Sequence, residues 1–274
     1  NRGYPKIFND ATVGEEAQKL FADAQKLLKE IVDGKLLEAR GIVGFYRAAS
    51  QGDDILLFED DECTKPVGTL FGLRQQAEKE SDEPYYCMSD FVAPTSSGIP
   101  DYIGMFAVSA GFGIEKLVER FQGELDDYQS IMAKALADRL AEAFAEVLHQ
   151  KVRKSLWGYC PDEDLDPASL LKVRYQGIRP APGYPSQPDH LEKDTMWRVM
   201  KVEEKTGIQL TESLMMRPEA AVCGQYLAHP KSKYFSVGQM KLDQFEDYAS
   251  RKSVSKDELA RRGGLSSLIA EKFD

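Results

Sequence analysis

The sequence lacks the features of a membrane-spanning or nucleic-acid-binding protein. No apolar stretch reaches the roughly 18 uncharged residues that a membrane-spanning helix needs. The formal net charge is −10 at pH 7, and two short basic clusters, at 151–154 and 261–262, lie in helical patterns. Because binding to nucleic acid requires a basic face that releases counterions, we expect neither a membrane nor a nucleic acid as partner.

Cysteine and histidine are scarce, and their spacing offers no metal or redox motif. The four cysteines lie far apart, without a CxxC pair: Cys63, Cys87, Cys160 and Cys223. Because the start of the chain lacks the apolar core of a signal peptide, we expect free thiols in a reducing cytoplasm. The three histidines, His149, His190 and His229, fit no metal-ligand spacing, so we predict no bound metal.

The common catalytic signatures are missing too. The sequence has no GxSxG elbow, no P-loop, no HExxH motif and no GxGxxG after a strand. The residues alone therefore favour a binding module over a self-sufficient catalyst. The chain begins with Asn1 rather than Met, so we expect it to be a piece of a longer protein.

What is present is typical of a globular domain. The 274 residues are 42% apolar and 29% charged, which suits one large domain or two small ones. Helical periodicity predicts one long helix, from Asp126 to about Leu156, in which His149 is expected to be a surface or packing residue. Shorter helices are predicted to start at the capping box 12–15, at Asp166 before Pro167, and at Asp189, Asp243 and Ser255.

The remaining apolar segments predict strands. They are 40–46, 53–58, 85–92, 102–109, 210–215, 221–227 and 234–240, the last two as an antiparallel pair. A short helix is predicted at 72–81 and a loop at 94–100. Because strands and helices do not alternate regularly, we predict an α+β fold, with an antiparallel sheet flanked by helices, rather than a doubly wound parallel sheet.

The most unusual segment is Arg179-Pro180-Ala181-Pro182-Gly183-Tyr184-Pro185. Its three prolines fix much of the backbone and lack N–H donors, so neither a helix nor a central strand can form there. Such a stiff loop loses little entropy when a ligand binds, and Arg179 could clamp a carboxylate or a phosphate with two hydrogen bonds. Spacing alone nevertheless favours the simpler interpretation, a rigid connection to the helix at Asp189.

Four further residues have both a structural and a binding interpretation. Asp90 lies in a predicted strand, where a carboxylate is usually a turn acceptor but could receive an ammonium group. Glu142 lies between two alanines of the long helix, as a solvated residue or beside a ligand. Tyr234 and Phe235 are more often core residues at a strand start, but they could cover an adenine ring or attract a sulfonium cation.

Seven segments of the chain together resemble the sequence of one known protein family. They are 90–94, 101–104, 134–146, Tyr175-Gln176-Gly177-Ile178 leading into the Arg179 loop, 210–213, 232–235 and 246–249. In this order, and covering about Tyr4 to Lys252, they resemble the C-terminal activation domain of cobalamin-dependent methionine synthase. A lone Arg-x-x-x-Gly-Tyr would be a weak signal, whereas the ordered set is highly specific.

The resemblance implies one C-shaped α+β domain, residues 1–274, that binds S-adenosylmethionine in a shallow groove. Cobalamin and the homocysteine chemistry belong to preceding domains that this chain lacks, so no catalytic residue is predicted here. When cob(I)alamin is oxidised to cob(II)alamin, an electron donor reduces it and methyl transfer from S-adenosylmethionine restores methylcobalamin. No general base is required, because the nucleophile is cobalt(I) and the leaving group is a neutral thioether.

The resemblance also places eight ligand-binding residues on this sequence. They are Asp90, Glu142, Arg179, Ala181, Gly183, Tyr184, Tyr234 and Phe235. Arg179 should bind the ligand's carboxylate and Asp90 its ammonium group, with Glu142 as a weaker candidate. The backbone at 181 and 183 should face the adenine or ribose, with Tyr184 beside it, and the two aromatic residues at 234–235 should line the site.

Some segments depart from the bacterial pattern of the family. Bacterial members tend to have Tyr-Tyr where Tyr234-Phe235 stands. The sequences at 83–87 and 185–188 are similar to those of animal members. The partner implied is therefore a diflavin reductase, where bacterial members use flavodoxin. The tail 261–274 does not resemble the family's usual ending, and no function is predicted for it.

Two functions of other classes stay open. One is an interaction module whose acidic face recruits the reductase. The other is a free-standing S-adenosylmethionine methyltransferase with its own acceptor, for which the sequence offers no clear acceptor pocket or base.

Overall fold

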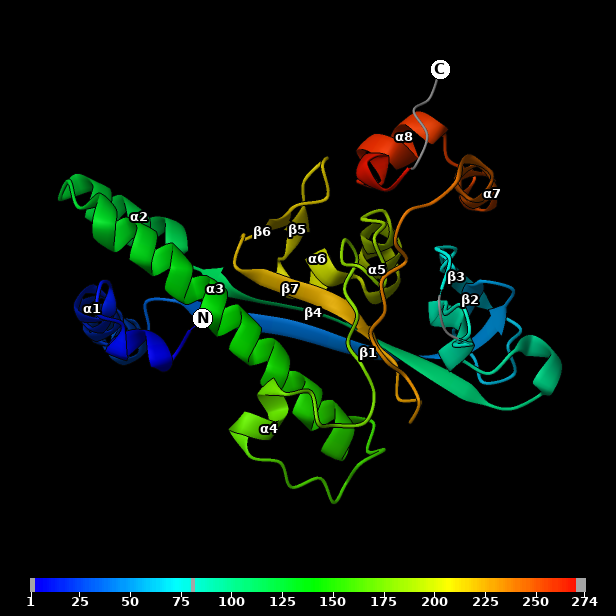
Figure 1. Ribbon diagram of the computed structural model, residues 1–274, viewed down its shortest axis with the longest axis horizontal. Coiled ribbons are helices and arrows are strands. Elements are labelled where there is room, and N and C mark those ends of the chain that lie inside the picture. The colour runs from blue at the N-terminus through cyan, green and yellow to red at the C-terminus, as the bar shows by residue number, and fades with distance from the viewer. Residues whose placement is uncertain (1–2, 80–81, 270–274) are drawn as a thin grey trace. The chain divides into compact units, whose positions relative to one another are not determined.

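The computed structural model describes residues 3–79 and 82–269 and has an α+β architecture (Figure 1). The chain divides into two compact units. Unit 1 comprises residues 1–40, 109–144 and 218–221, and unit 2 comprises residues 41–108, 145–217 and 222–274. The assignment of the whole chain to one domain stays a prediction. Within the described ranges, no helix is both long enough and apolar enough to cross a bilayer.

Five strands form the main sheet, and the expected α+β class with an antiparallel sheet flanked by helices is confirmed. β2 pairs antiparallel with both β1 and β3. The strand order is β3 (Pro66–Leu70), β2 (Asp54–Phe58), β1 (Glu38–Gln51), β4 (Asp101–Phe112) and β7 (Ala221–Tyr226) (Figure 1). A separate small antiparallel pair consists of β5 (Gln209–Leu210) and β6 (Met216–Arg217).

Unit 1 is built mainly from helices. After the short 3-10 helix Lys6–Asn9 it contains α1 (Gly14–Asp33), α2 (Ile114–Gly123) and the first part of α3 (Asp127–Lys151). Their apolar stripes meet in one core: Leu27, Ile31, Leu117, Phe121, Met132 and Ala133. The periodicity that predicted α1 and α3 from the sequence therefore reflects real burial.

Unit 2 contains the remaining helices. α3 ends here and continues as a π-helical turn, Val152–Leu156, and 3-10 turns lie at Met88–Phe91, Thr95–Ser97 and Ser266–Leu268. The α-helices are α4 (Pro167–Leu171), α5 (Glu192–Met200), α6 (Val202–Thr206), α7 (Leu242–Lys252) and α8 (Lys256–Arg261). α7 and α8 follow one another at the end of the chain (Figure 1) and share a core with fully buried Phe245, Tyr248, Leu259 and Leu265.

Two of the predicted helix caps are confirmed and three are wrong. Asp166 accepts a hydrogen bond from Ser169 N, and Ser255 accepts one from Glu258 N, as N-cap side chains do. α1 begins at Gly14 without a side-chain cap, because Asp10 takes the amides of residues 12 and 13 instead. Likewise neither α5 nor α7 has a side-chain cap, since their N-cap positions are residues 191 and 241.

Three predicted strands are wrong. Residues 88–91 of the predicted strand 85–92 form a 3-10 turn, because Asp90 folds back to accept a hydrogen bond from Cys87 N. Residues 211–215 turn tightly between β5 and β6, with Leu214 at a φ of 62°. The segment 234–240 has apolar residues because Val237 and Met240 enter the core, but it pairs with none of the strands in residues 3–79 and 82–269, and Met240 forms an isolated bridge with Ile269.

The predicted helix at 72–81 is also wrong as far as the structure describes it. Residues 72–79 form no helix, and residues 80 and 81 lie outside the described residues. The backbone there bonds to distant segments instead: Gln75 N donates to Tyr86 O over 3.0 Å, and Gly72 N donates to the Asp54 carboxylate over 3.1 Å. Long-range partners therefore override the local composition.

Candidate functional site

The proline-rich loop is anchored to the end of β7. Ile178 and Leu227 exchange two backbone hydrogen bonds of 3.0 and 3.1 Å, and Gln225 N donates to Pro180 O over 2.9 Å. Residues 178–180 therefore run antiparallel beside β7, as a short added edge. Because Pro180 and Pro182 have no N–H, this edge cannot extend further, and the chain turns away at Ala181.

Gly183 makes the following turn possible. Tyr184 N donates to Ala181 O over 3.2 Å, and Gly183 N donates to Gln187 O over 2.8 Å. Gly183 has a φ of 92°, and a Cβ at this position would lie 2.1 Å from Cε1 of His190. Only glycine fits here, because both the backbone angle and the imidazole ring exclude a side chain. The Tyr184 side chain points out and is 63% exposed.

Neighbouring residues hold His190 in place beside Gly183. His190 N donates to Gly263 O over 3.0 Å, and its Nδ1 lies 3.1 Å from Lys193 Nζ. A buried ionic cluster holds the neighbouring residues, since Lys252 Nζ lies 2.6 Å from Asp189 Oδ2 and 2.5 Å from Glu192 Oε1. This cluster ties the start of α5 to the end of α7, and burial raises the pKa of Glu192 to about 7.

The segment 234–237 forms hydrogen bonds with the proline-rich loop. The Tyr234 hydroxyl accepts a hydrogen bond from Arg179 N over 3.0 Å. Phe235 N donates to Ser186 Oγ over 3.0 Å, and Val237 N donates to Pro185 O over 2.9 Å. The structure thus brings together six of the predicted residues, which come from two distant parts of the chain: Arg179, Ala181, Gly183, Tyr184, Tyr234 and Phe235.

The Arg179 side chain is held by three groups. Its Nη2 lies 2.7 Å from Glu146 Oε2 in an ion pair. Its Nη1 donates to the Tyr175 hydroxyl over 3.2 Å and lies 3.4 Å from His149 Nδ1. The guanidinium is therefore already oriented, but the Arg179 and Glu146 side chains keep 19% and 23% of their surface exposed.

His149 is a neutral part of this arrangement. Its ring stacks on Tyr226 with centroids 4.9 Å apart and is fully buried. Burial, together with the nearby charges of Arg153 and Arg179, lowers the pKa of His149 to about 2. Because a guanidinium can only donate, His149 Nδ1 must accept, so the ring proton sits on Nε2, which lies 3.5 Å from the Tyr159 hydroxyl.

The contacts of Glu146 and His149 with Arg179 were not predicted from the sequence. His149 is buried against Tyr226, as the packing interpretation from the sequence expects, but no role was predicted for Glu146 or Tyr175. A usable signal was present, because Glu146, His149 and Arg153 recur at helical spacing along the end of α3 and the π-helical turn that continues it. Polar residues along an otherwise apolar stripe indicate that the helix faces a polar neighbour.

Asp90 and Glu142 are placed differently from the other six residues. Asp90 binds Arg74 through both oxygens, each at 2.8 Å. It is close to the aromatic edge of the site, since the ring of the next residue, Phe91, lies 6.5 Å from that of Phe235. Glu142 belongs to unit 1, where its side chain is exposed. The predicted ligand contacts of both carboxylates stay predictions.

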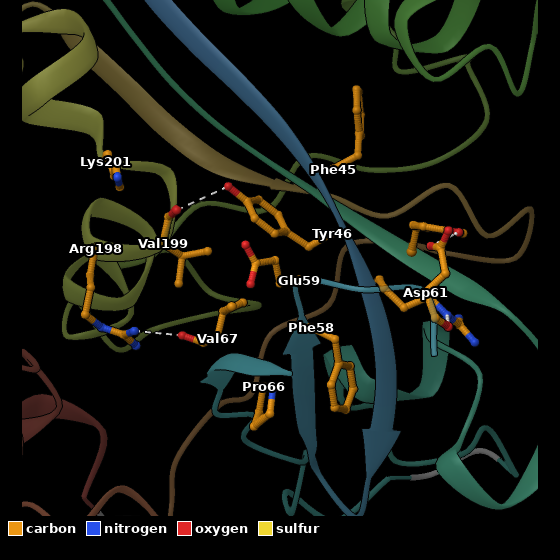
Figure 2. A pocket seen from close by; sticks show the side chains of 12 residues that line it. Phe45, Tyr46, Phe58, Glu59, Asp61, Pro66, Val67, Arg198, Val199 and Lys201 are labelled. Atoms are coloured by element: carbon orange, nitrogen blue, oxygen red, sulfur yellow. Dashed lines mark hydrogen bonds between the residues drawn. The ribbon is translucent and has the colours of Figure 1, made fainter. Parts of the chain in front are cut away.

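A separate hollow of about 570 Å³ lies in unit 2 (Figure 2). Arg198 donates to Val67 O over 2.7 Å at its wall, and the Tyr46 hydroxyl faces Val199 O at 3.4 Å. The carboxylate of Glu59 extends into it (Figure 2). None of the eight predicted ligand-binding residues is among its lining residues, so this hollow is distinct from the predicted site.

The part of the chain that the structure describes contains no disulfide bond and no metal-binding cluster. The four cysteines are free thiols there, and burial raises the pKa of Cys87 and of Cys223 to about 11. No group of three or more His, Cys, Asp or Glu side chains in residues 3–79 and 82–269 could hold a metal ion.

Comparison with known proteins gives the family. The model of the family described as vitamin B12 dependent methionine synthase, activation domain, matches residues 1–253. The chain belongs to this family. A solved structure, a crystal structure of the MetH reactivation domain bound to AdoHcy, is 49% identical with a TM-score of 0.93. That alignment covers 98% of this chain and 82% of the other.

The family match agrees with the resemblance seen in the sequence. The domain is part of a cobalamin-dependent methyltransferase of methionine biosynthesis. The match ends at residue 253, so the tail that looked divergent from 261 lies outside it. In the structure the described part of this tail, residues 261–269, packs against the rest of unit 2, because Leu265 is fully buried and Gly263 O accepts the hydrogen bond from His190 N.

Proposed function

We propose that this activation domain binds S-adenosylmethionine at the Arg179 loop and supports reductive methylation of cob(II)alamin. The observation that carries the proposal is the AdoHcy bound to the 49% identical MetH reactivation domain. AdoHcy is what S-adenosylmethionine becomes when it has given up its methyl group. The oriented guanidinium, the exposed Tyr184 and the Tyr234 side chain support a site for such a ligand here.

In this proposal the chain's own residues bind and orient the ligand. Arg179 binds the carboxylate, the backbone at Ala181 and Gly183 faces the adenine or ribose, and Tyr184, Tyr234 and Phe235 line the site. The cobalamin, bound by another domain of the same enzyme, supplies the metal that accepts the methyl group. Because the leaving group is a neutral thioether, the domain has no proton to remove, which suits a site without a general base.

The partners are then the cobalamin-binding domain and an electron donor, a diflavin reductase or a flavodoxin. The charge of −10 suits docking to a basic surface. A reductase-recruiting module without ligand binding, and a free-standing methyltransferase, are the competing functions. Turnover by the isolated domain with S-adenosylmethionine would favour the methyltransferase, and we expect none.

Calorimetry tests ligand binding. We expect the wild-type domain to bind S-adenosylmethionine and AdoHcy, and Arg179→Lys to weaken both by about 2 kcal/mol or more, because lysine keeps the charge but loses the two-pronged contact. The control is Arg174→Ala, whose exposed side chain lies outside the loop. Absence of binding by the wild-type domain would refute the proposed function. Unchanged binding by a folded Arg179→Lys would show that another residue binds the ligand's carboxylate.

A further inference from the structure

Strand β1 has an edge that β2 covers only in part. β1 extends from Glu38 to Gln51, but its pairing with β2 stops at Arg47, opposite Phe58. In the sheet, β1 lies between β2 and β4. Within residues 3–79 and 82–269, the segment 41–46 of β1 therefore has no strand on the side of β2. An open edge of this kind presents N–H and C=O groups that can pair with another chain.

The register shows which backbone groups face the open side. In an antiparallel sheet, alternate residues of a strand direct both their N–H and their C=O to the same neighbour. Ser50 N donates away from β2, to Ala93 O over 2.9 Å, so the odd-numbered residues of β1 face the side of β2. Val43 and Phe45 accordingly direct their N–H and C=O groups to the open side, where an added strand would find them.

The hollow of about 570 Å³ lies where β2 leaves β1, because Phe45 and Tyr46 of β1 and Glu59, directly after β2, are among its lining residues. Both faces of β1 are covered at this point. The ring of Phe45 lies 5.2 Å from that of Trp157, and the Tyr46 hydroxyl faces Val199 O at 3.4 Å. Since the faces are covered and the edge is open, the space suits one extended segment.

The sequence of this edge does not protect it from pairing. Residues 41–45 read Gly-Ile-Val-Gly-Phe and contain neither a charge nor a proline. Natural proteins commonly protect exposed edges with charged side chains, proline or a bulge. The β-branched Ile42 and Val43 instead favour an extended, paired backbone. The edge is therefore suited to the addition of a strand.

Glu59 gives the hollow a preference for charge. Its carboxylate extends into the hollow beside Tyr46 (Figure 2) and has no ion-pair partner within the described ranges. Arg198 also lines the hollow, but its guanidinium is directed to the wall, where it donates to Val67 O over 2.7 Å. An incoming segment with a lysine or arginine side chain would therefore complement the unpaired carboxylate.

We propose that the open edge of β1 and the hollow beside it bind an extended, basic segment of a partner protein by strand addition. The backbone of this segment pairs with Val43 and Phe45, and one of its basic side chains pairs with Glu59. In strand addition the main-chain hydrogen bonds provide affinity and alternate side chains provide specificity. None of the eight predicted ligand-binding residues lines this hollow, so the site is independent of the proposed binding of S-adenosylmethionine.

Synthetic peptides test the edge and the charge separately. The probe is an acetylated and amidated peptide, Thr-Val-Lys-Val-Thr, titrated into the ¹⁵N-labelled domain and followed by NMR. We expect it to shift the amide resonances of Val43 and Phe45. Because a partly exposed ion pair contributes little, it should bind only about two- to fivefold more tightly than the same peptide with glutamine in place of lysine. A peptide with N-methylated valines should not bind, since it lacks the main-chain donors.

Two variants isolate the contribution of Glu59. Glu59→Gln should abolish the preference for the lysine peptide over the glutamine peptide but keep the shifts at Val43 and Phe45. The matched control is Glu62→Gln, which replaces an exposed glutamate outside the lining of the hollow and should keep the preference.

Three results would overturn the proposal. The first is the absence of shifts at Val43 and Phe45 with the lysine peptide. The second is tighter binding of a peptide with glutamate in place of the lysine, which would favour an acidic segment bound by Arg198 and Lys201. The third is a dimer in sedimentation whose Val43 and Phe45 amides are protected from hydrogen exchange, because a second copy of the chain would then occupy the edge.

Discussion

At the scale of single residues, chemical type could be predicted but partners could not. The sequence indicated that Arg179 carries the one fixed positive charge of the loop. It did not indicate that Glu146, 33 positions earlier, would meet that charge at 2.7 Å. The resemblance pointed to Asp90 for the ammonium, and the structure places Arg74 on that carboxylate. Side chains that lie far apart in sequence meet only after the chain has packed, so residue type alone cannot name them.

Gly183 provides a residue-scale prediction. Gly183→Ala should lower the free energy of unfolding by roughly 1–3 kcal/mol and weaken AdoHcy binding, because the φ of 92° is unfavourable with a Cβ and His190 occupies its place. Urea denaturation and calorimetry would measure the two effects. The matched control is Gly52→Ala, also at positive φ but with no atom within 4 Å of the added Cβ.

For Gly52→Ala we expect a cost of about 1 kcal/mol, from backbone strain only, and unchanged ligand binding. Equal binding by the two alanine variants would show that the turn at Gly183 does not shape the site.

At the scale of elements, the accuracy of sequence reasoning followed the range of the interactions. Helix α3 and the caps at Asp166 and Ser255 depend on neighbours within four residues, and they were predicted correctly. The segment 234–240 was predicted as a strand from its apolar residues. Its backbone instead bonds to the loop through Pro185 O, and its side chains fill the core around α7. Apolar composition records burial but not the hydrogen-bond partner.

The C-terminal tail provides an element-scale prediction. Leu265 is fully buried in the core shared by α7 and α8, so Leu265→Ala should cost about 2–5 kcal/mol of stability. It should also weaken AdoHcy binding, because Gly263 next to this core holds His190 behind Gly183. Leu171→Ala is the control, since that side chain is 81% exposed in α4. If thermal denaturation showed equally small losses of stability for Leu265→Ala and Leu171→Ala, the tail would contribute little to the stability of the domain.

At the scale of the whole molecule, buried titratable groups make stability depend on pH. His149 has an ordinary pKa near 6.5 when unfolded and about 2 when folded. Below pH 6.5 the unfolded chain therefore binds a proton that the folded protein refuses, so stability falls as the pH drops. Between pH 7 and pH 5 this group alone should remove about 2 kcal/mol.

Comparing variants isolates this contribution. His149→Gln should lose less stability than the wild type between pH 7 and pH 5, by about 2 kcal/mol, because glutamine does not titrate. His229→Gln, in which an exposed histidine is replaced, should keep the wild-type pH dependence. Urea denaturation at a series of pH values provides the comparison, and parallel curves for wild type and His149→Gln would contradict a buried neutral imidazole.

The sequence by itself determined the α+β class, the helices with local caps, the stiff loop at 179–185 and, through its ordered motifs, the family. These depend on short-range sterics, periodicity and residue identity, which the chain carries wherever it folds. Only the tertiary structure decided that Glu146 and His149 orient Arg179, that Arg74 occupies Asp90, and that the tail supports Gly183 through His190. Those contacts join residues up to 73 positions apart, as in His190 and Gly263, and burial sets the protonation of His149 only once the core around it has formed.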